Sequence, residues 1–329
     1  MTITHALIAR RGDDKTQTVA FEDIPLADLP AGEVLVRVSH SALNYKDALA
    51  ITGRAPIVRQ WPMVLGIDLA GEVVESASAG FAPGDKVLVN GWGLSETRWG
   101  GYSQYQRLPA DLVQKIPAGL TAEQAMQIGT AGYTAMLCVM ALQDHGVAPD
   151  QGPVLVTGAS GGVGSIAVVL LSRLGFEVQA VSGRPEQAAY LRDLGAAEVL
   201  DRAAMSAGGK PMARERWAGC VDAVGGEPLA EVIAQIRSHG TVATCGMAAG
   251  GALPTTVYPF ILRGVTLAGV ESITCPMSRR VTAWDRLARE MPAATLAGLS
   301  QTRAFAELPG LADDLLAGRL HGRVAIAIP

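Results

Sequence analysis

Residues 153–164 read PVLVTGASGGVG, and this stretch decides the fold. A short apolar strand leads into a glycine-dense turn, and the apolar run 165–174 that follows is typical of a helix. Glycines at 158, 161, 162 and 164 lack Cβ atoms, so a pyrophosphate can approach the backbone, and the helix start directs N–H groups at it. The order strand, turn and helix predicts a nucleotide phosphate site rather than a plain turn.

The end of the next strand, residues 176–181, indicates which nucleotide binds. In NAD sites this end carries an Asp or Glu that accepts a hydrogen bond from the ribose 2′-hydroxyl. Here it reads Ser182-Gly183-Arg184, and a hydroxyl, a backbone amide and a guanidinium suit a 2′-phosphate instead. The prediction is NADPH rather than NADH. The alternative is that Arg184 is a solvated residue at a helix start before Pro185.

The composition agrees with a soluble enzyme, and the length suits two domains. The chain has 329 residues, of which 49% are hydrophobic and 18% charged, and its net charge is −4. Without a long cationic run it has no electrostatic footprint for nucleic acid or for an anionic membrane surface. Uninterrupted apolar stretches such as 166–171 are shorter than the ~20 residues of a membrane span, and the start lacks a signal-peptide core. We therefore expect a cytoplasmic protein with neither partner.

Metal ligands are not grouped in the sequence. The four cysteines, at 138, 220, 245 and 275, form no C-x-x-C pair, and the five histidines lack a spacing such as H-E-x-x-H. The expectation is no metal and no disulfide.

The chain divides into two patterns. Residues 1 to about 120 show short strands broken by turns, at 34–38, 64–74 and 86–89. After residue 121 strands and helices alternate, which predicts an α/β fold with a parallel sheet. The expected strands are 153–157, 176–181, 198–200, 219–223, 241–245 and 265–270, and the expected helices are 122–140, 163–174, 186–194 and 228–238. The tail from about 278 reads as two helical stretches and a strand at 324–328 that rejoins the first domain.

Stretches spread over almost the whole chain carry a family resemblance. They are LNYKDALAITG at 43–53, GIDLAG at 66–71, GWG at 91–93, WGG at 99–101, IGTAG at 128–132, the glycine-rich turn, VSGR at 181–184, LPTT at 253–256 and PFILR at 259–263. With them the chain resembles the NADPH-dependent acrylyl-CoA reductase family, in the zinc-free quinone-oxidoreductase-like branch of the medium-chain dehydrogenase/reductase superfamily. A short-chain dehydrogenase is excluded, because no tyrosine has a lysine four positions later.

The resemblance implies a definite domain plan. A GroES-like, β-rich catalytic domain would comprise residues 1–124, completed by 272–329. A Rossmann-type, doubly wound domain with six parallel strands would comprise 125–271. Zinc-using members of the superfamily have a metal-binding Cys and a Gly-His-Glu, where this chain has Gly66-Ile67-Asp68 and no cysteine before residue 138. This departure agrees with the expectation of no metal.

The first domain must supply the chemistry, and Asn44-Tyr45-Lys46-Asp47 is its best candidate. For Asn44 and Asp47 the alternative is helix capping, with Asn44 as N-cap and Asp47 at the third position. A cap gives Tyr45 no task, and the resemblance places the tyrosine of this motif beside the nicotinamide. Tyr45, Asn44 and Asp47 are therefore the candidate catalytic residues, with Tyr45 also a cofactor contact.

The resemblance also implies the reaction and the remaining contacts. The reaction is reduction of acrylyl-CoA to propanoyl-CoA by hydride transfer to the β-carbon, with a small acyl-CoA as partner molecule and a homodimer as assembly. A quinone or enone reductase and a non-catalytic NADPH-binding protein remain open. By matching positions, the cofactor contacts are Thr130, Ser160, Gly161, Gly162, Val163, Ser182, Gly183, Arg184, Met247, Ile261, Ser272 and Arg323. The alternatives are a helix-interior hydroxyl for Thr130 and a surface salt bridge for Arg323.

Overall fold

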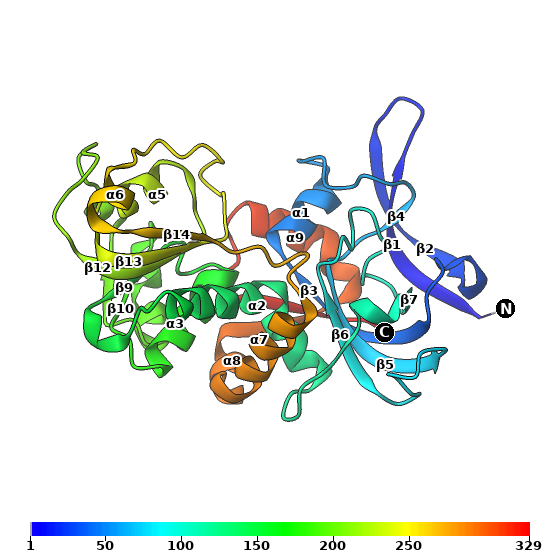
Figure 1. Cartoon of the computed structure of the whole chain (residues 1–329). Coiled ribbons are helices and arrows are strands. Elements are labelled where there is room, and N and C mark those ends of the chain that lie inside the picture. The colour runs from blue at the N-terminus through cyan, green and yellow to red at the C-terminus, as the bar shows by residue number, and fades with distance from the viewer. Residues whose placement is uncertain (1) are drawn as a thin grey trace. The chain divides into compact units, whose positions relative to one another are not determined.

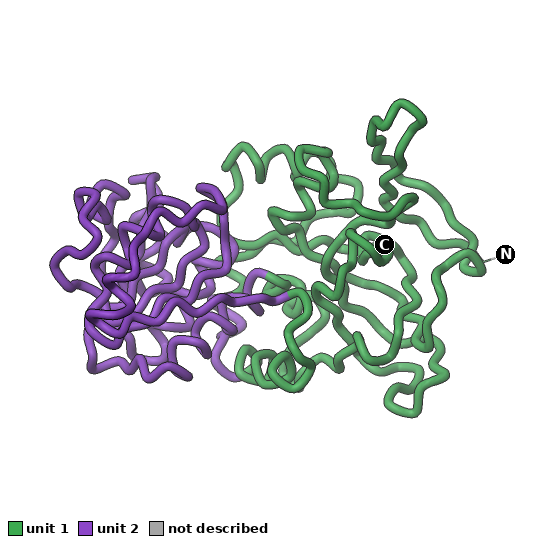
Figure 2. The backbone as a smooth tube through the Cα atoms, turned by 45° about the horizontal axis from the view of Figure 1, so that its top comes forward, with its two compact units in different colours: residues 1–130, 273–288, 296–329 green, residues 131–272, 289–295 purple. Residues whose placement is uncertain are grey.

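The computed structural model describes residues 2–329 and divides into two compact units (Figures 1 and 2). Unit 1 consists of residues 1–130, 273–288 and 296–329, and unit 2 of residues 131–272 and 289–295. Each unit has its own apolar core.

Unit 2 contains a six-stranded parallel sheet in the order β11-β10-β9-β12-β13-β14 (Figure 1). Its strands are β9 (Val154–Val156), β10 (Val178–Val181), β11 (Glu198–Leu200), β12 (Trp217–Asp222), β13 (Ile236–Thr244) and β14 (Thr266–Gly269), and its helices α3 (Gly162–Arg173), α4 (Ala188–Asp193), α5 (Gly226–Ile233) and α6 (Tyr258–Arg263). From β9 the strands that follow in sequence are added first on one side, as β10 and β11, and then on the other, as β12, β13 and β14, as in doubly wound folds. The α/β class and the six parallel strands are confirmed.

One predicted helix of unit 2 is too long at its C-terminal end. The sequence predicts a helix over 228–238, but α5 ends at Ile233 and β13 begins at Ile236. Leu229, Val232, Ile233 and Ile236 have helical spacing, so the pattern alone extends the helix. Ile236 instead pairs with Trp217 of β12, and both side chains are fully buried.

Unit 1 is built on strands that pair antiparallel, except that β15 and β16 are parallel. One sheet has the order β2-β1-β4, and the larger one has the order β15-β16-β3-β5-β6-β8, with β7 paired to β3. The strands are β1 (Ile3–Arg11), β2 (Gln17–Pro25), β3 (Val34–Leu43), β4 (Met63–Val64), β5 (Asp68–Ser76), β6 (Lys86–Asn90), β7 (Tyr105–Leu108), β8 (Gln114–Lys115), β15 (Ser300–Ala304) and β16 (Arg323–Ala327). The β1–β2 hairpin and β15 were not predicted.

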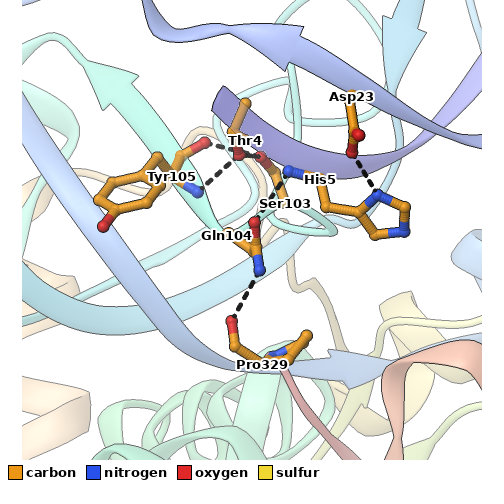
Figure 3. Close-up of polar contacts among 7 residues, drawn as sticks. All are labelled: Thr4, His5, Asp23, Ser103, Gln104, Tyr105 and Pro329. Carbon is orange, nitrogen blue, oxygen red and sulfur yellow. Dashed lines mark hydrogen bonds and ion pairs between the residues drawn. The ribbon is translucent and has the colours of Figure 1, made fainter. Parts of the chain in front are cut away.

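Side-chain hydrogen bonds tie the first strand of unit 1 to a segment about 100 residues later and to the chain end (Figure 3). The hydroxyls of Thr4 and Ser103 are 2.8 Å apart, and the Tyr105 N–H donates to Thr4 Oγ1 at 2.9 Å. The His5 N–H donates to Gln104 Oε1, whose amide nitrogen donates to the Pro329 carbonyl oxygen at 3.1 Å. These contacts hold residues near both chain ends against residues 103–105.

The C-terminal part differs from the predicted two helices and one strand. It contains α7 (Met277–Glu290), α8 (Ala293–Leu299) and α9 (Leu308–Leu316), with β15 between α8 and α9. β16 pairs antiparallel with β3, so the last strand does rejoin the first part of the chain. α9 packs beside α1 (Tyr45–Thr52), the helix that carries the candidate tyrosine (Figure 1).

Helix α2 (Ala122–Asp144) is broken at Gly129, whose φ of 55° and ψ of −166° are not helical. By length and composition α2 is the helix among residues 2–329 that passes a test for a membrane span. In its most apolar window, however, 89% of the residues are buried inside the protein. That burial is typical of a core helix.

Candidate active site and cofactor site

The glycine-rich turn after β9 has the backbone geometry that a phosphate site needs. Gly158 has a φ of 58°, in the left-handed region that favours glycine. A Cβ atom at Gly164 would lie 2.3 Å from the Gly158 carbonyl oxygen, so α3 can begin this close to the turn only without a side chain there. The N–H groups of Gly162 and Val163 belong to the first turn of α3, where no intrahelical acceptor exists. Residues 160–163 therefore surround a helix start suited to an anion.

Two arginines converge on the end of β10. The Arg184 N–H donates to the Ser182 hydroxyl at 3.1 Å, and Arg184 Nη2 donates to Ser160 Oγ at 3.3 Å. The second arginine is Arg202: a Cβ atom on Gly183 would lie only 2.4 Å from its Nε. We call Ser182, Gly183, Arg184 and Arg202 the two-arginine site.

Arg202 was missed in the sequence, although a signal for it exists. It starts the short 3-10 helix Arg202–Met205, two residues after β11 ends at Leu200. β10 and β11 are parallel neighbours, and Val181 pairs with Leu200 in their register. Parallel neighbours end at the same sheet edge, so a basic residue just after β11 falls beside the end of β10.

Asp222 is a second residue that the sequence did not reveal. Its fully buried carboxylate ends β12 and accepts hydrogen bonds from the hydroxyls of Thr157 at 2.7 Å and Thr244 at 3.0 Å. It also accepts from the Gly225 N–H at 3.0 Å. Thr157 follows β9 and Thr244 ends β13, so this carboxylate ties together the carboxyl ends of three adjacent strands.

Asp47 and Asn44 lie in the interior of unit 1. The carboxylate of Asp47 accepts hydrogen bonds from the Asn44 N–H, the Asn44 side-chain amide and the Ile67 N–H, each at 2.9 Å. The bond to the Asn44 N–H is one half of a capping box at the start of α1. Asn44 Oδ1 has no hydrogen-bond partner among the described residues, so Asn44 does not return the bond. Capping thus accounts for Asp47 better than for Asn44, and their catalytic role stays a prediction.

Burial changes the protonation of this region. Desolvation, assisted by the nearby charge of Asp68, raises the pKa of Asp47 to about 7. Desolvation also raises the pKa of the fully buried Tyr102. It lowers the pKa of Arg323, although the negative charges of Asp68 and Asp47 partly oppose that lowering. Two carboxyl groups and one guanidinium therefore share a poorly solvated space.

The raised pKa of Asp47 predicts a pH-dependent stability. Because the folded-state pKa lies above the unfolded one, folding favours the protonated carboxyl. The stabilisation is fully present below about pH 4 and is lost as the pH rises through about 7, at most of order 4 kcal/mol. In urea unfolding at several pH values, the free energy of unfolding should fall less between about pH 4 and pH 7 for Asp47→Asn than for the unchanged protein. The exposed Asp193→Asn is the control, and a parallel decline in Asp47→Asn would contradict the assignment.

Tyr45 is the first residue of α1 and is 57% exposed, unlike its two buried neighbours in the motif. The adjacent Lys46 forms an ion pair with Glu96, and Arg59 lies 3.9 Å from the same carboxylate. Lys46 is thus held in an ion pair, whereas Tyr45 is an exposed residue of unit 1.

Thr130 and Arg323 both lie at the break in α2. Neither the helix-interior hydroxyl considered for Thr130 nor the surface salt bridge considered for Arg323 agrees with the contacts found there. The Thr130 hydroxyl donates to Asp68 rather than to its own helix, and the Thr130 N–H donates to Asp68 Oδ2 at 2.9 Å. Arg323 is 3% exposed and donates to the carbonyl oxygens of Gln127 and Leu43, so it forms no surface salt bridge. Its Nη2 has no hydrogen-bond partner among residues 2–329.

The remaining predicted contacts belong to unit 2. Met247 follows β13 and is 74% exposed, while Ile261 lies on α6 and is 73% exposed. Ser272 is half-buried after β14. Exposed apolar side chains at the carboxyl ends of strands suit contact with a ligand, and these three assignments stay predictions.

The described part of the chain, residues 2–329, contains no group of three or more His, Cys, Asp or Glu side chains placed to hold a metal ion. Its four cysteines are all free thiols.

Known proteins match both units. Residues 30–118 match the alcohol dehydrogenase GroES-like domain, and residues 162–289 match the zinc-binding dehydrogenase family. Acrylyl-CoA reductase AcuI of Ruegeria pomeroyi is 48% identical, over 98% of this chain and 99% of that protein. The yhdH oxidoreductase of Salmonella enterica, solved in complex with NADP, is 47% identical with a TM-score of 0.96, over 99% of this chain and 100% of that one. Protein yhfP of Bacillus subtilis, solved with NAD bound, is 42% identical with a TM-score of 0.95 over both whole chains.

The fold and these matches define a medium-chain dehydrogenase/reductase. Within this class the chain belongs to the acrylyl-CoA reductase family. The resemblance drawn from the sequence is therefore confirmed.

Proposed function

We propose that the protein reduces the 2,3 double bond of a short 2-enoyl-CoA, acrylyl-CoA to propanoyl-CoA, with NADPH as the reductant. The two-arginine site is the observation that carries the proposal: it places two guanidinium groups at the strand end that distinguishes the two nicotinamide cofactors, where residues 182–184 include no carboxylate. The relative named acrylyl-CoA reductase, 48% identical over nearly the whole chain, supports the substrate.

The residues present fit NADPH. Gly158 has a left-handed φ of 58° and Gly164 has no room for a Cβ atom, so the turn keeps a backbone without side chains that a pyrophosphate could approach. The buried Nη2 of Arg323 and Oδ1 of Asn44 are an unused donor and an unused acceptor among the described residues. When bound, NADPH supplies the hydride for the β-carbon of the enoyl thioester. Residues 160–163 would hold its pyrophosphate, and Arg184 with Arg202 its 2′-phosphate.

The residues of the site must then stabilise the negative charge on the thioester oxygen and allow one proton to reach the α-carbon. As the β-carbon gains hydride, charge accumulates on the thioester oxygen, and the α-carbon afterwards takes a proton. Tyr45 would donate a hydrogen bond to that oxygen or the proton itself. Lys46 is paired with Glu96, and Asp47 is buried with three donors, so water is the source that returns a proton to the exposed Tyr45.

A comparison of acceptors at one NADPH concentration tests the proposed function. Acrylyl-CoA should give a kcat/KM at least about a hundredfold above that of a simple quinone or a free enone, because only the thioester carries the coenzyme A part whose binding lowers the barrier. Faster quinone reduction would identify a quinone reductase instead. NADPH binding without oxidation by any acceptor would identify a non-catalytic protein.

The assembly and location are further parts of the proposal: a homodimer in the cytoplasm. Among residues 2–329, β14 ends the six-stranded sheet and pairs with β13, which leaves a strand edge available for pairing with a second copy. Light scattering during size-exclusion chromatography should give twice the chain mass, and a monomer mass would contradict the dimer.

A further inference from the structure

Asp68 is a fully buried carboxylate that accepts four hydrogen bonds from three separate segments of unit 1. The Asn44 side-chain amide donates to Oδ2 at 2.8 Å, and that of Asn90 donates to Oδ1 at 2.7 Å. Thr130 supplies its N–H and its hydroxyl. Each carboxylate oxygen therefore accepts two bonds.

The bonds from Thr130 have a specific cause. Gly129 is not helical, so the part of α2 that follows it begins as a new helix with unsatisfied N–H groups. Asp68 supplies an acceptor to the N–H of Thr130, as an N-cap residue does, but from a strand 62 residues away in sequence. A Cβ atom at Gly129 would lie 3.0 Å from Asp68 Oδ2 and 2.5 Å from Arg323 Nη2, so this carboxylate and this guanidinium flank the break.

The donors to Asp68 adjoin the residues that the proposed function uses. Asn44 directly precedes Tyr45, and Thr130 is itself an expected cofactor contact. We propose that Asp68 is a positioning residue for hydride transfer, because its one carboxylate fixes both the turn that presents Tyr45 and the restart of α2 at Thr130. The inference rests on the proposed function and assigns Asp68 no contact with the substrate.

Asp68→Asn is the direct test, since it keeps the shape but replaces one acceptor oxygen by a donor. Two of the four bonds then lose their acceptor, and the Tyr45 turn and Thr130 shift relative to each other. We expect kcat for acrylyl-CoA reduction to fall at least about tenfold, with the Kd of NADPH, measured by fluorescence, changed less than about threefold. A merely structural Asp68 would instead lower the melting temperature and leave the kcat of the folded fraction unchanged.

Ser41→Ala is the matched control. The buried Ser41 hydroxyl donates to the backbone carbonyl of Asp68 at 2.6 Å and does not touch the carboxylate, so kcat should stay within about twofold. If Asp68→Asn fails to fold, Thr130→Val removes a single donor and should lower kcat about threefold or more.

The outcomes separate this inference from the proposed function. If the unchanged protein reduces acrylyl-CoA while folded Asp68→Asn and Thr130→Val keep its kcat within twofold, the positioning role is overturned and the function stands. If the unchanged protein does not reduce acrylyl-CoA, the proposed function itself is wrong.

Discussion

Replacing Arg184 by alanine should raise the KM for NADPH about thirtyfold and leave the KM for NADH within about threefold. A hydrogen bond between charged groups contributes about 1.5–3 kcal/mol, which corresponds to a factor of about 10 to 150 in affinity. NADH has no 2′-phosphate and makes no use of the guanidinium. Steady-state rates with each cofactor at saturating acrylyl-CoA measure the two constants.

Arg202→Ala should also raise the KM for NADPH, because Arg202 would bind the same 2′-phosphate. The double variant Arg184→Ala/Arg202→Ala should have similar KM values for NADPH and NADH. Arg202 lies against Gly183, so both guanidinium groups adjoin one strand end. Arg192 is the control, because it is exposed on α4 in the same unit, and Arg192→Ala should change neither constant by more than about twofold. Equal losses for NADPH and NADH in Arg184→Ala would remove the phosphate assignment.

The sheet of unit 2 was predictable because its signals are local. An apolar strand, a turn rich in glycine and a helix follow one another within a few residues, and repeated alternation of this kind predicts a parallel sheet. The same locality explains the error at 228–238, where Ile236 continues a helical pattern but pairs with Trp217 in the sheet. Periodicity does not distinguish these cases, because both bury the side chain.

The polar network of unit 1 could not be predicted from the sequence. Asp68 is joined to Asn44, Asn90 and Thr130, which are 24, 22 and 62 residues away, and no spacing rule links them. Arg323 is a similar case: an arginine near the chain end reads as a surface residue until β16 pairs with β3 and carries it inside. Buried polar groups depend on contacts made by the complete fold, whereas the glycine-rich turn depends on its own sequence.

Replacing Tyr45 by phenylalanine should lower kcat for acrylyl-CoA reduction at least about tenfold, an increase of ~1.4 kcal/mol in the barrier. The ring remains, so packing at the start of α1 is kept, and the hydroxyl alone is lost. Charge on the thioester oxygen appears only as hydride arrives, so a donor aimed at that charge changes kcat more than the KM for acrylyl-CoA.

The control for this variant is Tyr105→Phe. Tyr105 bonds to Thr4 and Ser103 through its backbone N–H and carbonyl oxygen, which the substitution keeps (Figure 3). Loss of that hydroxyl should leave kcat within about twofold. If Tyr45→Phe also keeps kcat within twofold, the exposed phenol is not the acid. Asn44 would not replace it, because its side-chain amide already donates to Asp47 and Asp68, and its unpartnered Oδ1 is an acceptor.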